Sequence, residues 1–595
     1  MPAEFDQLPS GLYVPAPKRI DLLVPATDSA EDAEPEPSIG QQVAIRLSTA
    51  ELNLVPMTLS ELRAEAAGVP FEASFVGIGM IANRLYDIWR DGAAQLALLR
   101  EVLGGAPLIT RYEHALESFP GAIVLSQQQL FITQRLLLQH ARDTPVGDAD
   151  ITEDDAVSLT RLLVHSLDLI DASHPRLSEG RAELIDLVAY FVQAAAYDSR
   201  RALANEFGRA YDIFFVRGRE VGDERVPLDD WAREDVGLTL EEQLAGGFGY
   251  HAMASQPNSD TGRLPAQVRL NVLANSAIAD AEERVAFALS APRSWFREQF
   301  AKGDQSVRDV AWEVGPFMRR PFVRLQGGNV ALASPSALVE WLTFGMYDRL
   351  RESAIKRRPL KKKPDILNLF TSIYGDLTED YCLDVVRSAY ADGQVHGDQP
   401  YGKGGGQRTP DVAILAGEED VVLIEVRSGY LSPWFRTSGD IAEFADQLDK
   451  LVFRKLTQLG RRIADIKLGT ATIPGLDMTT VKRIWPILIT ASMIVSEPFW
   501  QIVEPAMPSA LKEPDIQKLV IGDVEDLEML IGLVEQGHDL IEILRRRQET
   551  PYVQLELKRW VFGEMDVAST TRASFVLDRW ERAQEAMKAT LWPDP

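Results

Sequence analysis

The spacing of hydrophobic residues changes along the chain and predicts two kinds of structure. From residue 58 to about 310, apolar residues recur at helical spacing, which predicts a mainly helical region. Beyond residue 320, shorter apolar runs alternate with helical stretches, and a Gly-Gly-Asn turn at 327–329 indicates a small hairpin. Before residue 58 the chain lacks helical periodicity and includes ATDSAEDAEPEPS, which is typical of a loop or a disordered segment.

Two of the short apolar runs carry acidic residues and are joined by a polar turn, AGEED. The first reads TPDVAIL and begins with Asp411; the second reads VVLIEVRSG and holds Glu425 near its end. Because side chains alternate between the faces of a strand, Glu425 and Arg427 share one face. The pattern predicts a β-hairpin that brings both carboxylates together, as a hard divalent cation needs. An acidic hairpin end without a metal is the simpler alternative.

The segments around this hairpin predict the rest of a small α/β unit. A helix is expected over residues 364–391, broken near Gly375, followed by the connector GDQPYGKGGGQR, interpreted as a flexible flap. A second helix is expected over 440–466, because its apolar residues fall on one helical face. The run IWPILITASMI is rich in β-branched residues, which favours a strand.

This order of helix, three strands, helix and strand, with the motifs PD at 410–411 and EVR at 425–427, resembles the PD-(D/E)XK, or restriction-endonuclease-like, superfamily. The resemblance covers about 140 of the 595 residues. It implies a nuclease that hydrolyses phosphodiester bonds, with Asp411 and Glu425 holding Mg²⁺ or Mn²⁺.

The first helix of that superfamily often donates a further glutamate, and Glu379 lies at the corresponding place. The resemblance therefore implies a catalytic role for Glu379. The alternative is structural: Asp376 and Glu379 have the spacing of a capping box that would begin a new helix after Gly375.

Arg427 departs from the superfamily pattern, which has lysine at this position. Arginine binds phosphate well but stays protonated, so Arg427 could stabilise charge and could not take a proton from water. In some members a lysine from the following helix takes this role, and Lys450 and Lys455 lie on the expected helix.

The distribution of charge singles out the same part of the chain. Residues 356–500 contain 19 Lys and Arg and 19 Asp and Glu, so the rest of the chain accounts for the net charge of −26. This segment opens with KRRPLKKK. Its basic residues are candidates for phosphate contacts, the alternative being a solvated linker: Lys356, Arg357, Arg358, Lys361, Lys362 and Lys363.

Composition limits the class of protein. The lone cysteine, Cys382, excludes an internal disulfide and indicates a reducing compartment. The first residues lack the basic start and apolar core of a signal peptide, and no apolar run approaches the length of a membrane span. A cytoplasmic protein is expected.

After residue 500 the pattern predicts a strand and two short helices, a strand over 552–562, and a closing helix over about 570–592. The whole chain is expected to be an α+β multidomain protein with a large helical N-terminal region, a restriction-endonuclease-like α/β core and a small mixed C-terminal extension. The predicted divisions are an N-terminal segment, a helical domain, a hairpin-and-helix connector, the nuclease core and the extension: 1–57, 58–318, 319–355, 356–500 and 501–595.

Two function classes follow. The first is a metal-dependent nuclease, with DNA favoured over RNA as substrate, in prokaryotic antiviral or restriction-type defence; the defence role rests on analogy. The second is an inactive scaffold of the same fold that binds nucleic acid or a protein partner. In both, the helical N-terminal region is a candidate for partner binding or self-association.

Overall fold

The computed structural model describes most of the chain. The described residues are 5–7, 13–15, 46–88, 91–104, 107–119, 121–143, 151–173, 183–198, 203–220, 226–255, 266–270, 273–302, 306–357, 365–429, 431, 441–491, 497–550, 553–554, 556–565, 567 and 571–592. Within them, no helix combines the length and the apolar character needed to cross a membrane.

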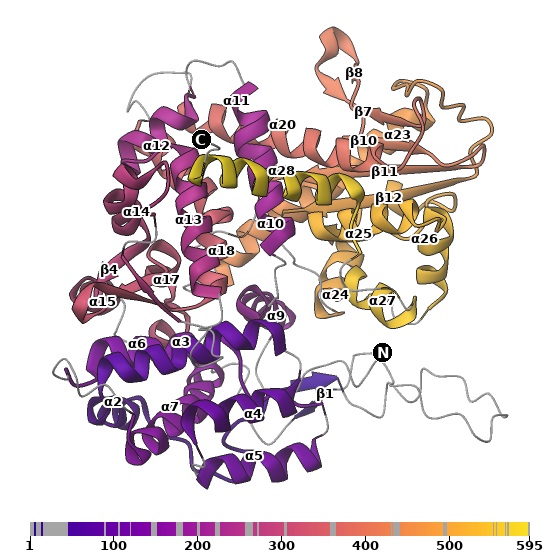
Figure 1. The fold of residues 1–595 in the computed structure, drawn as a ribbon. Helices are drawn as coiled ribbons and strands as arrows, with labels where there is room; N and C mark the ends of the chain where they lie inside the picture. Colours follow the sequence, from indigo (N-terminus) through magenta and orange to yellow (C-terminus); the bar gives the residue numbers. More distant parts are fainter. Residues whose placement is uncertain are drawn as a thin grey trace.

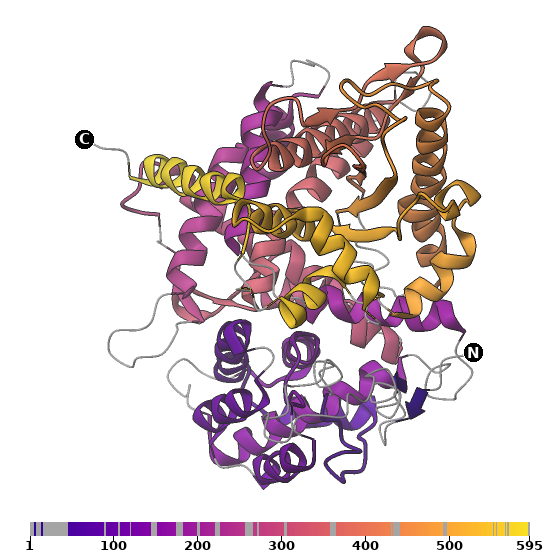
Figure 2. The ribbon, with the colours of Figure 1, turned by 90° about the vertical axis from the view of Figure 1, so that its right-hand side faces the viewer.

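The N-terminal part is helical, as predicted, and forms the lower layer in Figures 1 and 2. A short antiparallel pair, β1 (Phe5–Gln7) and β2 (Tyr13–Pro15), precedes it. Helix α6 begins with a capping box of Ser126 and Gln129 and is buried along most of its length, so the neighbouring helices pack around it. The helices are α2 (Leu59–Gly68), α3 (Phe71–Ile88), α4 (Gly92–Leu103), α5 (Pro107–Ser118), α6 (Gln127–His140) and α7 (Glu153–Ala172).

A second helical group surrounds a small sheet with the strand order β3-β6-β5-β4. The predicted hairpin is present as β5 (Phe322–Arg324) and β6 (Asn329–Leu332), and Gly327 and Gly328 at its turn have positive φ, which glycine allows. The outer strands are β3 (Gln267–Arg269) and β4 (Ser290–Pro292). Helix α9 (Leu184–Asp198) lies outside this group and packs against α6 and against helices of the C-terminal half. The helices of the group are α10 (Leu203–Ala210), a π-helical turn (Tyr211–Arg217), α11 (Gly218–Glu220), α12 (Leu228–Val236), α13 (Leu240–Ser255), α14 (Glu282–Leu289), α15 (Arg293–Ala301), α16 (Val307–Trp312), α17 (Gly315–Arg319), α18 (Pro335–Leu342) and α19 (Phe344–Lys356).

A larger mixed sheet contains the predicted acidic hairpin. Among the described residues its strand order is β13-β12-β11-β10-β7, with the bounds β7 (Val395–Gly397), β10 (Val412–Leu415), β11 (Asp420–Arg427), β12 (Arg483–Thr490) and β13 (Val520–Asp523). Strand β10 is antiparallel to β7 and β11, whereas β11, β12 and β13 are parallel. The apolar character of both faces of β11 fits this central position.

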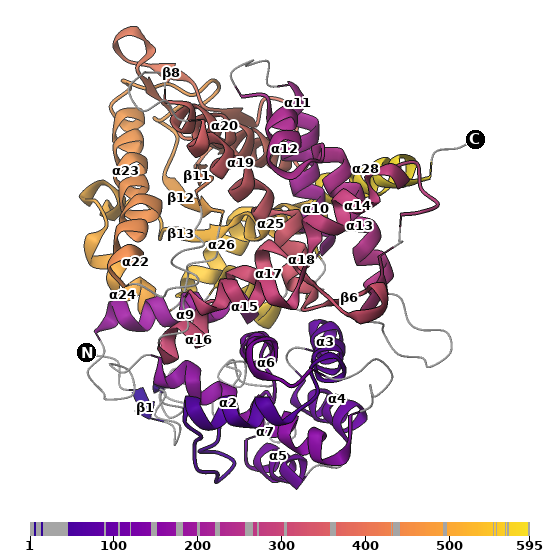
Figure 3. The ribbon, with the colours of Figure 1, turned by 90° about the vertical axis from the view of Figure 1, so that its left-hand side faces the viewer.

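Helices cover both faces of this sheet. Val422, Ile424 and Val426 pack in one hydrophobic cluster with residues of α20 (Ile366–Arg387), and Val421 and Leu423 pack in another with residues of the helix that follows β11. That second helix consists of α22 (Ile441–Leu448), a π-helical turn (Asp449–Phe453) and α23 (Arg454–Lys467). Figure 3 shows β11, β12 and β13 between α23 and α20.

Two local predictions were wrong, the helix break near Gly375 and the strand over 552–562, whereas the flexible flap stays a prediction. Helix α20 runs through Gly375 without a break, because one glycine costs a helix only about 1 kcal/mol and buried residues on both sides stabilise it. The glycine-rich connector includes a small hairpin of β8 (Pro400–Tyr401) and β9 (Gln407–Arg408), and Tyr401 donates a hydrogen bond to Asp465 of α23 at 2.6 Å. The expected strand over 552–562 contains α27 (Leu557–Glu564) instead.

The remaining C-terminal elements agree with the sequence pattern: β13 is followed by two helices, and a long helix ends the described chain. Besides α27, the helices after β12 are α24 (Glu497–Ala506), α25 (Val524–Glu535), α26 (Leu540–Glu549) and α28 (Ser574–Leu591). The predicted domain boundaries stay predictions, and one hydrophobic cluster extends across three of them, from Phe207 to Leu591.

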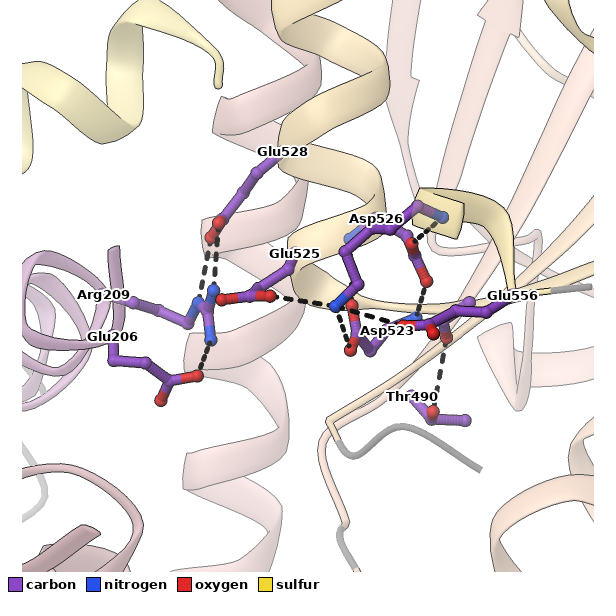
Figure 4. A network of polar contacts seen from close by, with 10 residues as sticks. Glu206, Arg209, Thr490, Asp523, Glu525, Asp526, Glu528 and Glu556 are labelled. Carbon is purple, nitrogen blue, oxygen red and sulfur yellow. Dashed lines mark hydrogen bonds and ion pairs between the residues drawn. The ribbon is translucent and has the colours of Figure 1, made fainter. Parts of the chain in front are cut away.

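Buried ion pairs connect the helical region with the C-terminal part (Figure 4). Arg209 of α10 makes two hydrogen bonds of 2.9 Å with Glu528 of α25, and Tyr381 of α20 donates to the same carboxylate at 2.8 Å. Beside them, Lys558 contacts Asp523 at 3.1 Å and Glu525 at 2.9 Å. These contacts join α10, α20, α25 and α27 in one buried polar network.

Candidate functional site

The strand register places the two predicted acids opposite each other. Val412 pairs with Ile424 in the antiparallel hairpin, so Asp411, directly before β10, lies beside Glu425. Asp411 Oδ2 accepts a hydrogen bond from the backbone N–H of Val426 at 2.7 Å. Both acids are buried, Glu425 with no exposed surface. The hairpin therefore holds two carboxylates together in a buried place.

Helix α23 adds two cations to the acids. Lys455 Nζ lies 2.6 Å from Glu425 Oε1 and 4.0 Å from Asp411 Oδ2. Arg462 Nη1 lies 3.1 Å from Asp411 Oδ1 and also hydrogen-bonds Glu425 Oε2. Because one guanidinium nitrogen contacts both carboxylates, the two acids lie within reach of one shared cation. Lys455 and Arg462 are seven residues apart and so share a helix face.

Glu379 belongs to the same electrostatic cluster. It lies within continuous α20, so the capping-box alternative does not apply. Burial, then repulsion from Asp411, raises the pKa of Glu379 to about 8, with Lys455 opposing the shift. Three carboxylates thus influence one another: Glu379 of α20, Asp411 directly before β10, and Glu425 of β11.

The buried charges in the cluster shift one another's pKa values. Burial and repulsion from Asp411 raise the pKa of Glu425 to about 7, although Lys455 and Arg462 oppose this. Burial disfavours the charged form of Arg462, but Glu425 and Asp411 outweigh this and raise its pKa. The protonation states of acids and cations are therefore coupled.

Arg427 lies at the end of β11, beside Thr490 of β12, and does not pair with Glu425 among the described residues. Its Nε atom is buried and has no hydrogen-bond partner there. Burial raises the pKa of Tyr347 of α19, and the positive charge of Arg427 opposes this rise. Arg427 is thus near the cluster without neutralising it.

The structure shows which of the other basic candidates contact the two acids. Lys450 forms an exposed ion pair with Asp446 at 2.5 Å, so of the two helix lysines only Lys455 contacts the acids. Lys356 pairs with Asp235 at 3.1 Å, and Arg357 also contacts Asp235, at 3.4 Å. The other candidates lie outside the described residues: Arg358, Lys361, Lys362 and Lys363.

The acids suit a hard cation by their oxygen donors, yet protein cations already occupy them. Each oxygen of Asp411 and Glu425 accepts a hydrogen bond from Val426, Lys455 or Arg462. In the described part of the chain, no group of three or more His, Cys, Asp or Glu residues is arranged to hold a metal ion. A metal-bound state therefore requires the Arg462 guanidinium to leave the shared position.

Arg462 is the site residue that the sequence argument missed. Its signal was available: a basic residue on the apolar side of an amphipathic helix, between the buried Leu459 and Ile463. A buried arginine in such a place needs a carboxylate partner. The sequence alone did not show that this partner was the acidic hairpin.

The raised pKa of Glu379 predicts how stability depends on pH. Between about 4.5 and about 8 the folded protein keeps a proton that the unfolded chain has lost, so this group lowers the free energy of unfolding as pH rises. The slope for one proton is at most about 1.4 kcal/mol per pH unit. Urea unfolding from pH 5.5 to 7.5 should therefore show a flatter decline for Glu379→Gln than for the parent. The exposed Glu418→Gln is the control, and equal slopes for all three proteins would refute the assignment.

The chain was also compared with known proteins. No protein-family model matches it, and no curated protein sequence matches it.

Proposed function

We propose that the chain is a metal-dependent nuclease that hydrolyses phosphodiester bonds. One observation carries the proposal: Asp411 and Glu425 face each other on adjacent antiparallel strands and share contacts with Lys455 and Arg462. The order α20, β7, β10, β11, α22–α23, β12 supports it, because it is the order that the resemblance to the PD-(D/E)XK superfamily implies. DNA as the favoured substrate and a role in prokaryotic defence rest on the resemblance and on analogy.

In this proposal Asp411 and Glu425 would hold Mg²⁺ or Mn²⁺. The bound ion would lower the pKa of a water molecule and neutralise charge that develops on the phosphate. The Val426 N–H fixes the orientation of Asp411 through Oδ2 and leaves Oδ1 to accept from Arg462 of α23. Glu379 interacts electrostatically with both acids and is the candidate for a third carboxylate beside the metal.

Lys455 is the best candidate for the role of the motif lysine. Its Nζ already contacts Glu425, whereas Arg427 cannot exchange a proton near neutral pH. Arg427, with a buried Nε that lacks a partner among the described residues, suits a phosphate contact. In this proposal Lys455 of the helix would handle protons and Arg427 of the strand would contact the phosphate, two roles that the superfamily lysine combines.

Lys455→Met should therefore lower the cleavage rate by about 10²-fold or more, the scale of losing one preorganised charged donor. Lys450→Met removes a lysine from the same helix that pairs with Asp446 on the surface, so it should leave the rate unchanged. Single-turnover cleavage under saturating metal measures both. Equal rates for the two variants would show that Lys455 has no role in the reaction.

The alternative is a protein that kept the fold and lost the chemistry. It is favoured by one observation: Lys455 and Arg462 already neutralise the acids, so the cluster is satisfied without a metal. Calorimetric titration with Mn²⁺ separates the two functions. A nuclease should bind Mn²⁺, with affinity lost in Glu425→Gln. A parent protein that binds no Mn²⁺ would favour the scaffold, which would bind nucleic acid or a protein through the helical region.

A further inference from the structure

A second surface, away from the carboxylates, combines an exposed aromatic ring with arginines. Phe287 of α14 is 62% exposed, which is unusual for a phenylalanine. The guanidinium carbons of Arg320 and Arg324 lie 5.6 and 5.7 Å from the centre of its ring. Arg319, exposed at the end of α17, precedes Arg320. We call these four residues the Phe287 patch. In Figure 1, α14 and β4 lie on the left side of the molecule and α17 lies further in.

The arginines of the patch are held by neutral groups. Arg320 Nη1 donates to the backbone oxygens of Ala288 and Arg319, and Arg324 Nε donates to Ser290 Oγ at 2.9 Å. Among the described residues, no carboxylate forms an ion pair with Arg319, Arg320 or Arg324, although the charge of Arg319 acts on Glu313 and opposes the rise in its pKa. Their positive charges are therefore not neutralised by ion pairs within the described structure.

This concentration of charge stands out in an acidic chain. The protein has a net charge of −26, and exposed arginines elsewhere, such as Arg545, pair with two glutamates. Burial lowers the pKa of Arg320, and repulsion from Arg324 and Arg319 lowers it further. An anionic partner would relieve that repulsion.

We propose that the Phe287 patch binds a strand of nucleic acid, with the arginines on phosphates and the ring of Phe287 against a base. A ring that is mostly exposed and has two guanidinium groups over it offers both elements of single-strand binding, electrostatic attraction and stacking. An acidic peptide would use the arginines and would leave the exposed ring without a planar partner. That the bound strand is also a substrate rests on the proposed function. That the Phe287 patch binds a strand does not depend on it.

Binding is tested in the full-length chain with Asp411→Asn, which prevents cleavage during the measurement. A fluorescently labelled single-stranded DNA of mixed sequence is titrated by anisotropy, and an RNA of the same sequence separates the two strand types. Phe287→Ala should weaken binding about fivefold or more, the lower end of losing one stacked base. Arg319→Gln with Arg324→Gln should lower the slope of log K against log salt by about 1.4, because each lost phosphate contact contributes about 0.7.

Two matched controls isolate the patch. Leu468→Ala removes a side chain that is 76% exposed elsewhere, and Arg545→Gln removes an exposed arginine that is already paired. Neither should change affinity. Patch variants that are folded by circular dichroism and bind either strand like the parent would overturn the proposal. So would polyglutamate binding to the patch where neither DNA nor RNA binds. Cleavage by the parent protein, which keeps Asp411, is assayed separately. If the patch binds strands and the parent never cuts them, only the proposed nuclease activity is refuted.

Discussion

Replacing Asp411 by asparagine is expected to lower the cleavage rate by about 10³-fold or more, while the protein stays folded. Asparagine keeps the volume and the oxygen that accepts from the Val426 N–H, but it removes the negative charge that Asp411 places beside Glu425. Removing one preorganised group of this kind costs about 10²–10³ in rate, and a lost metal ligand should lie at the upper end. Initial rates at saturating Mg²⁺ or Mn²⁺ measure the effect.

Asp446→Asn is the matched control, because Asp446 is an exposed acid on α22 that pairs only with Lys450 among the contacts described for it. It should cleave like the parent. If Asp411→Asn retained the full rate, the activity would have to come from another site or from a contaminant.

The second large effect concerns stability. Arg209→Met should lower the free energy of unfolding by about 3–5 kcal/mol, because it leaves the carboxylate of Glu528 buried without its cation. Tyr381 would remain as a neutral donor to Glu528. The double variant Arg209→Met with Glu528→Leu should recover part of the loss, since it removes the unpaired charge as well.

Equilibrium unfolding in urea measures these variants, and Arg545→Met is the control because its ion pairs lie on the surface. An Arg209→Met protein as stable as the parent would show that the buried pair does not hold the helical region against α25. If the double variant were less stable than Arg209→Met alone, charge burial would not be the cause.

The acidic hairpin could be predicted because its signals are local. The alternation of side chains in a strand and the length of the AGEED turn place Asp411 beside Glu425 without any knowledge of the rest of the chain. The two helices that cover the sheet have equally local patterns. The cations are different, because their position depends on how α23 is rotated against the sheet. That is why Lys450 and Lys455 were equal candidates and Arg462 was missed.

The errors have the same origin, which is tertiary packing outweighing a local signal. Gly375 suggested a helix break, but the buried Tyr374 and Leu377 on either side fix α20 in place. The segment 552–562 alternates apolar and polar residues, yet Leu557, Trp560 and Val561 are all buried, an arrangement that a helix allows. The pair of Arg209 and Glu528 joins residues 319 positions apart, which no local pattern reveals.

We propose that Asp411 and Glu425 form a metal-dependent cleavage site, and a plasmid-cleavage assay tests this proposal. Supercoiled plasmid is incubated with the parent protein or with Asp411→Asn in Mg²⁺ or Mn²⁺, with and without EDTA, and a long RNA is treated in parallel. The parent should cut a nucleic acid only when the metal is free, and Asp411→Asn should not cut. Cleavage that persists in EDTA, equal cleavage by Asp411→Asn, or no cleavage of either nucleic acid by the parent would contradict the proposal.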